Sequence, residues 1–448
     1  MTGLNPYPEY RNTAVPFLGE IPAGWQVQPV VTLARVLTST VDKHSVVGEA
    51  IVRLCNYTDV YYNDVITGAS EYMVATASRE QISSYSVTAG DVVFTKDSET
   101  ADDIGISSYV PHTIPGLVYG YHLSTYRPHD PRYGKFLKWL LDSKYAKATL
   151  QTRTLGVTRV GLSQNTVRYL RIPTPSPAEA SFIAAFLDRE TASIDAFIAD
   201  QEELIGLLAE RRVATISHAV TKGLDPSALT KDSGVAWWGR LPSNWTIKRI
   251  KEIVSTPVTD GPHETPEILD AGVLFVSAEA VGSGSLNLDR ARGYISEEDN
   301  LRFAKKYRPQ RDDIYMVKSG ATTGVVAIVD TDAVFNIWSP LAAIRCGALA
   351  HPKFVLYVMK SGQFREAVEL HWSFGTQQNI GMGVIENLPL PLPPIDEQRR
   401  IAEYLSYETS ELDGAVADAR EAITLSRERR AALISAAVTG KIDVRNAA

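Results

Sequence analysis

Residues 173–222 read PTPSPAEASFIAAFLDRETASIDAFIADQEELIGLLAERRVATISHAVTK, and residues 391–440 repeat this segment as PLPPIDEQRRIAEYLSYETSELDGAVADAREAITLSRERRAALISAAVTG. The copies align without a gap at a shift of 218, and about 23 of the 50 aligned pairs are identical. The match includes both edges, where prolines open each copy and Ala-Val-Thr closes it. The chain is therefore an internal repeat of two large halves.

A second repeated signature opens each half. Gly19-x-Ile21-Pro22-x-x-Trp25 returns as Gly239-x-Leu241-Pro242-x-x-Trp245. The repeat length of about 220 residues is far above the roughly 20–50 residues of solenoid repeats. Each tryptophan follows a proline and precedes an alternating polar–apolar run, which is more typical of a core anchor than of an exposed stacking platform. Matching ends around dissimilar middles predict one scaffold that presents two different binding surfaces.

Each repeated segment has the pattern of a long amphipathic helix. Apolar residues recur at steps of 4, 7, 4 and 7 along both copies: Ile183, Leu187, Ile194, Ile198 and Ile205, matched by Ile401, Leu405, Leu412, Val416 and Ile423. This spacing lays one apolar stripe along a helix. Proline is tolerated only in the first helical turn, so we expect the helices to begin near Pro177 and Pro394. Each stripe needs a partner, and the other copy in antiparallel orientation supplies one.

The predicted fold class is α+β. Two mixed α/β domains are separated by two long antiparallel helices of coiled-coil type, in a pseudo-two-fold internal repeat. A single short helix is expected near residues 135–150, with a counterpart near 353–370. The predicted boundaries are 1–175 for the first mixed domain, 176–222 for the central helical region, 223–392 for the second mixed domain and 393–448 for the C-terminal helical region.

Composition limits the class of protein. The 448 residues are 44% hydrophobic, which is enough to form cores, and no apolar run approaches the roughly 18 residues of a membrane span. The two cysteines, Cys55 and Cys346, stand at positions that do not correspond between the halves. A disulfide framework is therefore not expected, and we predict a cytoplasmic protein without membrane contact.

The net charge of −7 is unevenly distributed. Residues 177–219 carry a net −5 and residues 395–438 a net −3, so the rest of the chain is close to neutral. The acidity belongs to the predicted helices. A basic face on the mixed domains is compatible with this distribution, although the overall charge alone would argue against nucleic acid.

Sequence signatures of catalysis are missing. There is no GxxxxGK[ST] phosphate loop, no Gly-rich turn for a dinucleotide or adenosylmethionine, and no Asn-Pro-Pro-aromatic or Asp-Pro-Pro-aromatic motif. His and Cys spacings of the HxxxH or CxxC type are absent, so no metal site is predicted. Gly282-Ser283-Gly284-Ser285 lacks the strand-to-helix setting of a nucleophile elbow. We predict no catalytic residues and no cofactor bound by this chain.

The loops after two strand-like runs suggest a DNA-binding surface. Short hydroxyl, amide and cationic side chains on such loops suit contacts to phosphates and base edges. The predicted DNA-binding residues are Lys96, Ser98, Arg153, Thr158 and Arg159 in the first half, and Lys318, Ser319, Thr322, Thr323, Thr376, Gln377, Gln378 and Asn379 in the second. Each of these residues is also compatible with an ordinary solvated turn.

A repeated Glu-Arg-Arg run near both helix ends is as compatible with a partner-binding surface as with a solvated face. The predicted partner-binding residues are Glu210, Arg211, Arg212, Glu428, Arg429 and Arg430.

Taken together, these motifs resemble the specificity subunit of type I restriction–modification enzymes over essentially the whole chain. The resemblance rests on the two openings, on Gly375-Thr376-Gln377-Gln378-Asn379-Ile380, on the run from Pro391 to Gln398 and on the close from Leu433 to Asp443. The first half departs from this pattern in two places. Ala180 stands where the second half has Gln398, and Gly156-Val157-Thr158-Arg159 stands where it has Gly375-Thr376-Gln377-Gln378.

The resemblance implies a non-catalytic subunit with two target-recognition domains. Each would read one half of a split double-stranded DNA site, while the helices fix the gap and dock two modification subunits. Those partners would bind adenosylmethionine and methylate adenine, and two restriction subunits using ATP and magnesium are a further partner that the family allows.

Two alternatives remain open from the sequence. One is a two-headed coiled-coil adaptor in a related phage-defence complex that does not read DNA. The other is an enzyme acting on DNA, either a nuclease or a methyltransferase, although its expected motifs are missing.

Overall fold

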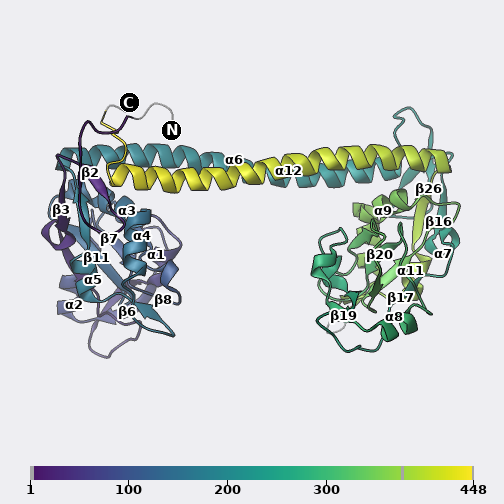
Figure 1. Ribbon diagram of the computed structural model, residues 1–448, viewed down its shortest axis with the longest axis horizontal. Coiled ribbons are helices and arrows are strands. Elements are labelled where there is room, and N and C mark those ends of the chain that lie inside the picture. Colours follow the sequence, from purple (N-terminus) through teal and green to yellow (C-terminus); the bar gives the residue numbers. More distant parts are fainter. Residues whose placement is uncertain (1–4, 375–377, 446–448) are drawn as a thin grey trace. The chain divides into compact units, whose positions relative to one another are not determined.

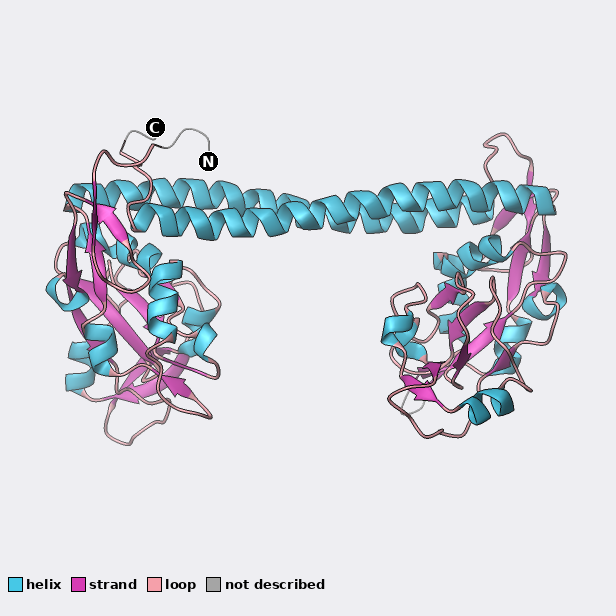
Figure 2. Cartoon of the chain, in the orientation of Figure 1, coloured by secondary structure: helices cyan, strands magenta, loops and turns pink. Residues whose placement is uncertain are grey.

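The computed structural model describes residues 5–374 and 378–445. The chain divides into two compact units, unit 1 (Met1–Gln201 with Glu421–Ala448) and unit 2 (Glu202–Arg420). Each unit combines a mixed α/β domain with parts of two long helices, α6 (Pro177–Lys222) and α12 (Ile395–Val438), as Figures 1 and 2 show. The predicted mixed α/β character and both long helices are confirmed. The predicted domain boundaries remain predictions, and the two compact units divide each long helix near its middle.

The α/β domain of unit 1 contains two main sheets. The four-stranded sheet has the order β4-β11-β7-β9 and the three-stranded sheet the order β10-β5-β6. Within the second sheet, β10 runs parallel to β5 and β6 runs antiparallel to it. The strands are β4 (Ala34–Thr38), β5 (Ala50–Cys55), β6 (Met73–Ala77), β7 (Val92–Thr95), β9 (Ser107–Tyr109), β10 (Leu117–Tyr119) and β11 (Leu123–Pro128).

The α/β domain of unit 2 repeats this topology. Its four-stranded sheet has the order β17-β23-β20-β21, and its three-stranded sheet has the order β22-β18-β19 with β18 and β22 parallel. Counted along the chain, each strand takes the same place as in unit 1. The strands are β17 (Thr259–Asp260), β18 (Val273–Val276), β19 (Gly293–Ile295), β20 (Ile314–Val317), β21 (Val326–Ile328), β22 (Phe335–Ile337) and β23 (Leu341–Ile344).

Small two-stranded elements complete both units. The opening signatures form the hairpins β1-β2 and β14-β15, and the strands that follow them pair with the strands that lead into the long helices. These elements are β1 (Tyr10–Asn12), β2 (Glu20–Pro22), β3 (Gln26–Pro29), β13 (Arg171–Thr174), β14 (Thr230–Asp232), β15 (Arg240–Pro242), β16 (Thr246–Arg249) and β26 (Pro389–Leu392).

Shorter helices cover the sheets. They are α1 (Tyr57–Tyr61), α2 (Arg79–Tyr85), α3 (Gly134–Asp142), α4 (Lys144–Gln151) and α5 (Gln164–Arg168) in unit 1, and α7 (Ile250–Ile253), α8 (Glu297–Phe303), α9 (Pro352–Lys360), α10 (Gly362–His371) and α11 (Met382–Asn387) in unit 2. The stretches predicted as helical, 135–150 and 353–370, are helical, but Ser143 and Ser361 each divide the stretch into two helices. Their backbones are extended and their hydroxyls accept from Ala146 N and Phe364 N, capping a second helix.

Both tryptophans of the opening signatures are core anchors, as predicted. Trp25 is 3% exposed and Trp245 is fully buried. The end of one long helix packs on each of them: Lys441, just beyond α12, donates to Glu20 O at 2.6 Å in unit 1, and Lys222 of α6 donates to Arg240 O at 2.9 Å in unit 2. The repeated ends of the sequence therefore build one repeated joint.

The two long helices pair antiparallel within each unit. In unit 1, the Arg430 guanidinium lies 2.8 Å from the Asp195 carboxylate, and in unit 2 Arg212 forms the matching ion pair with Asp413. The predicted apolar stripe is buried at Ile183 and Leu187 in unit 1, and at its counterparts Ile401 and Leu405 in unit 2. None of the helices within the described residues is long and apolar enough for a membrane span.

Each α/β domain contains the same buried staple. In unit 1, Arg127 donates to both carboxylate oxygens of Asp91, at 2.8 and 2.6 Å. In unit 2, Arg345 donates to both oxygens of Asp313, at 2.7 Å each. A tyrosine hydroxyl also donates to each aspartate, and the two aspartates are 0% and 1% exposed. This arrangement ties the strand before the predicted DNA-binding loop to its neighbour in the sheet.

Candidate nucleic-acid interface

The structure brings the predicted loops of unit 1 together. β8 (Asp97–Ser98) pairs antiparallel with β12 (Val160–Gly161), and Lys96 O accepts from Leu162 N at 2.8 Å. A small hairpin then places Thr158 and Arg159 at an exposed tip. The hairpin requires glycine at position 156, because φ is +113° there and a Cβ would lie 2.1 Å from Arg159 O. Lys96, Thr158 and Arg159 therefore belong to one surface, whereas the predicted Ser98 is buried, at 3% exposed.

The β8–β12 strand pair is called the ribbon of unit 1, and unit 2 has an equivalent ribbon. Lys318 O accepts from Ile380 N at 2.9 Å, and Ser319 pairs with Asn379 through an isolated antiparallel bridge. The Thr323 hydroxyl donates to Gly320 O at 2.8 Å, which fixes the turn. Gln378 and Asn379 form β25 (Gln378–Asn379), paired with β24 (Ser373–Phe374). Thr376 and Gln377 lie outside the described residues.

Three predicted residues have surroundings that the sequence did not indicate. Lys318 is only 9% exposed, and its ammonium lies 2.5 Å from the Asp260 carboxylate. Lys96 pairs with Asp97 at 2.7 Å, and Asp97 also contacts His122 at 2.8 Å. Arg153 lies beside Phe17 and Arg171. The two lysines therefore hold their loops through ion pairs, and Arg159 is the exposed cation at the tip.

The Asp260 cluster gives unit 2 a charged anchor beneath its ribbon. Lys306 and Lys318 both donate to the Asp260 carboxylate, and His263 lies 3.0 Å from it. Burial by itself would raise the pKa of Asp260, but the hydrogen bonds and charges of the two lysines hold this pKa below its ordinary value. The carboxylate therefore stays ionised and fixes the start of the loop.

Aromatic residues of α1 form a part of the unit 1 surface that sequence reasoning missed. The Tyr57 and Tyr61 rings stack at a centroid distance of 5.4 Å, and Tyr62 meets Tyr61 edge-on at 4.9 Å. Tyr57 lies beside Ser98 and Arg159. Its pKa is raised, mainly by burial, and a hydrogen bond with Ser98 and the Arg159 charge oppose this rise. The run Tyr57-x-x-x-Tyr61-Tyr62 was the available signal, because residues four apart share one helix face.

At the equivalent position unit 2 has no aromatic helix. The chain after β18 instead runs through a short 3-10 turn (Ala278–Ala280) into Gly282-Ser283-Gly284-Ser285. Gly282 lies against Thr322, whose side chain would be 3.5 Å from a Cβ at this glycine. One unit therefore offers stacked rings and an arginine, and the other offers hydroxyls and amides, on the same scaffold.

The predicted partner-binding residues divide into two groups. Glu210, Arg211, Glu428 and Arg429 are exposed on the long helices. Arg212 and Arg430 are half-buried and form the ion pairs between α6 and α12 described above. These two arginines have a structural role inside the chain, and the binding of a partner to any of the six stays a prediction.

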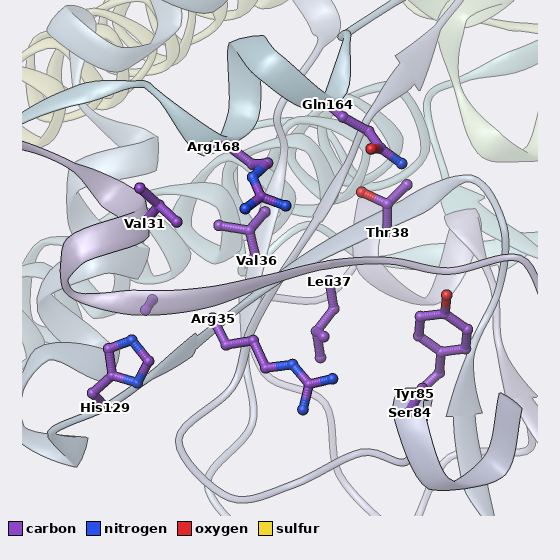
Figure 3. A pocket seen from close by; sticks show the side chains of 11 residues that line it. Val31, Arg35, Val36, Leu37, Thr38, Ser84, Tyr85, His129, Gln164 and Arg168 are labelled. Carbon is purple, nitrogen blue, oxygen red and sulfur yellow. The ribbon is translucent and has the colours of Figure 1, made fainter. Parts of the chain in front are cut away.

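A separate groove lies along the edge of β4 in unit 1. It has a volume of about 570 Å³ and includes Arg35, His129 and Arg168 in its lining (Figure 3). In Figure 1, α2 and α5 lie on one side of unit 1, and α1 and β8 lie on the other. This groove is therefore distinct from the β8–β12 ribbon.

The chain is similar in sequence to a described family model and to several known proteins. Residues 242–414 match the family model described as type I restriction modification DNA specificity domain. A protein of Methanocaldococcus jannaschii, named putative type I restriction enzyme MjaX specificity subunit, is 22% identical over 439 residues and covers 96% of both chains. The type I restriction enzyme StySPI specificity subunit of Salmonella potsdam is 20% identical over 408 residues, covering 87% of this chain and 84% of that one.

Solved structures share the fold. The HsdS subunit from Thermoanaerobacter tengcongensis has a TM-score of 0.54 at 17% identity, covering 94% of this chain and 98% of that one. A chain reported under "Structural basis underlying complex assembly and conformational transition of the type I R-M system" has a TM-score of 0.64 at 18% identity, covering 93% of this chain and 98% of that one. The similarity extends over nearly the whole chain.

Proposed function

We infer that this chain, which belongs to the family of type I restriction–modification specificity subunits, is the DNA-reading subunit of a type I restriction–modification complex. One observation carries the proposal. Both units have the same strand order and the same Asp–Arg staple, but they present different side chains on equivalent ribbons. Such an arrangement suits two readers of two different short DNA sequences.

Each reader would address one part of an asymmetric bipartite site. Hydroxyl and amide side chains such as Thr322 and Asn379 suit base edges, and Arg159 suits guanine or a phosphate. Two unlike readers predict two unlike half-sites, whereas two identical readers related by two-fold symmetry would read a palindrome. The repeated topology would supply the common scaffold, and the divergent ribbons would supply the asymmetry.

The long helices would set the unread gap between the half-sites. α6 contains 46 residues, which at 1.5 Å per residue is about 70 Å of continuous helix. The antiparallel pairing of α6 and α12, of coiled-coil type, would make this spacer stiff. Because ten base pairs span about 34 Å, a spacer of this length suits half-sites about two turns apart on one DNA face.

Catalysis would belong to the partners. We propose that two methyltransferase subunits dock on the helices and bind adenosylmethionine, and that two restriction subunits using ATP and magnesium join them in the restriction form. This chain would contribute specificity and no catalytic residue. Its acidic helices leave much of the phosphate affinity to the partners, so the isolated chain should bind DNA weakly and the complex tightly, with strong salt dependence.

The test is single-molecule sequencing of adenine methylation in the native host with and without this gene. A split, asymmetric motif should lose methylation when the gene is deleted and regain it on complementation. An unchanged methylation pattern, in cells where the partner methyltransferase is shown to be active, would contradict the proposal and favour the adaptor alternative.

A further inference from the structure

The groove in Figure 3 follows the free edge of β4 in unit 1. β4 is the first strand of the four-stranded sheet and pairs with β11 alone, so its other edge is unpaired within the described residues. All five residues of β4 line the groove. An edge of this kind is normally covered or blunted, because it is a template for another strand.

The backbone of β4 offers hydrogen bonds to the groove. Leu33 O accepts from His129 N at 2.9 Å and Ser39 N donates to Leu123 O at 3.3 Å. The backbone N–H and C=O groups of the odd-numbered residues therefore point toward β11. Successive residues of a strand alternate in direction, so the N–H and C=O of Val36 face the groove. Neither group has a partner within the described part of the chain.

The groove also presents uncompensated positive charge. Arg35 comes from β4 and Arg168 from α5, and neither forms an ion pair in the described ranges; no carboxylate lines the groove. Figure 3 shows Arg168 with Gln164 on one side of the strand, and Arg35 with His129 on the other. An added strand that carried acidic residues on either face would therefore meet an arginine.

Unit 2 lacks this groove chemistry at the equivalent place. Arg345 is the unit 2 counterpart of Arg127, and Ser255 N donates to Arg345 O at 2.9 Å. Ser255 therefore takes the place of Arg35, which pairs with Arg127 in unit 1. Proline follows two residues later at Pro257, and proline blunts an edge because it has no N–H. At the shift of 218, Glu386 replaces Arg168. The groove is therefore an addition to unit 1 and is not part of the scaffold that the two readers share.

We propose that the β4 edge of unit 1 binds an extended, acidic peptide segment of a partner protein. The segment adds as a strand beside β4, exchanges main-chain hydrogen bonds with Val36, and places carboxylates near Arg35 and Arg168. Main-chain pairing supplies affinity and the flanking charges select acidic sequences. This surface does not depend on the proposed DNA-reading role, because it lies on the other side of unit 1 from the β8–β12 ribbon.

The test uses the full chain and a fluorescein-labelled decapeptide of alternating Glu and Val, capped at both ends. Fluorescence anisotropy should show saturable binding. The same peptide methylated at every backbone nitrogen, and a Lys–Val peptide, should bind at least about tenfold more weakly, because the first has no N–H donor on either edge and the second is repelled.

Two variants place the site. The double substitution Arg35→Glu with Arg168→Glu should weaken binding about tenfold or more, and Val36→Pro should weaken it several-fold by removing one N–H at an edge that tolerates proline. Arg290→Glu, an exposed arginine in unit 2, is the matched control and should leave binding unchanged. Circular dichroism and thermal melts of all variants report whether they fold.

Hydrogen exchange on the unsubstituted chain keeps the test independent of variant folding. The Val36 amide should become protected when the Glu–Val peptide is added. Absence of this protection would overturn the proposal, as would equal binding of the N-methylated peptide. Displacement of the peptide by millimolar inorganic phosphate or by unrelated duplex DNA would also overturn it, because the groove would then be a general anion site.

Discussion

The two α/β domains share their sheet topology, their buried Asp–Arg pair and their helix joint, but they differ in the side chains exposed beside the ribbon. Both tie the strand before the ribbon to its neighbour with a forked Asp–Arg pair, and both join a long helix to an opening hairpin through a lysine. Beside the ribbon, unit 1 has the tyrosines of α1, whereas unit 2 has glycine and serine. Buried polar pairs therefore preserve the scaffold, while its surface residues are free to change.

The largest expected effect tests whether the staple is equivalent in both units. Asp91→Ala and Asp313→Ala each leave a forked arginine without its buried partner, which typically costs about 3–5 kcal/mol of unfolding free energy. Thermal or urea unfolding should show a similar loss for both variants. Asp332→Ala removes the partner of an exposed arginine and should not measurably change the melting temperature. A large loss in one unit alone would break the equivalence.

The joints at the helix ends should differ in tolerance. Gly440 has φ +70° and a Cβ there would lie 2.3 Å from Pro22 Cδ, whereas Gly223 has φ +72° and its nearest neighbour would be 3.3 Å away. Alanine costs about 1–2 kcal/mol at either φ, and overlap adds about 1–3 kcal/mol at Gly440. Unfolding of Gly440→Ala and Gly223→Ala should therefore show the greater loss in unit 1. Equal losses would show that Pro22 moves aside.

A substitution at the tip of the unit 1 ribbon should weaken DNA binding without changing the stability of the protein. Arg159→Ala removes an exposed cation and should weaken DNA binding by the assembled complex about tenfold, with a salt slope lower by about 1. Arg153→Ala is the matched control, since Arg153 is an exposed arginine beside Phe17 and Arg171 and not at the Thr158–Arg159 tip. Filter binding across a salt series measures both. A greater loss for Arg153→Ala would move the DNA surface away from the β8–β12 ribbon.

The smallest expected effect is the pH response of the Asp260 anchor. Its pKa is lowered in the folded protein, so its stabilising contribution is present above the unfolded value of about 3.9 and is lost as pH falls through the folded pKa. Carbon-13 NMR of the Asp260 carboxyl should give a midpoint below 3.9. Lys318→Met, which removes one partner, should raise that midpoint. A midpoint at or above 3.9 in the unsubstituted chain would contradict the anchor.

The sequence predicted the elements that depend on local periodicity. The step pattern of Ile183 and Leu187 defines the stripe of α6, and the prolines before it define the helix start. The common sheet topology was not predictable, because the middle regions have dissimilar sequences and the strands pair across long separations. For the same reason the burial of Lys318 was missed: Asp260, its partner, lies 58 residues away.

The helix pattern also could not assign each exposed face. Arg212 and Arg430 form ion pairs between α6 and α12 that their spacing did not indicate, and the binding of a partner to them stays a prediction. Their periodicity is compatible with either role, and only the position of Asp413 or Asp195 decides which surface they face. The tyrosines of α1 were missed because five residues give too short a period to indicate a helix.

The most direct test of two independent readers is methylation sequencing of cells that carry ribbon variants. Tyr61→Ala with Arg159→Ala should change the bases recognised in one half of the methylated motif, or lower methylation in a way that depends on the bases of that half only. Thr322→Val with Asn379→Ala should do so for the other half, and the gap should stay the same in both cases. If either pair of substitutions altered both halves together or changed the gap length, the account of one scaffold with two separate readers would be wrong.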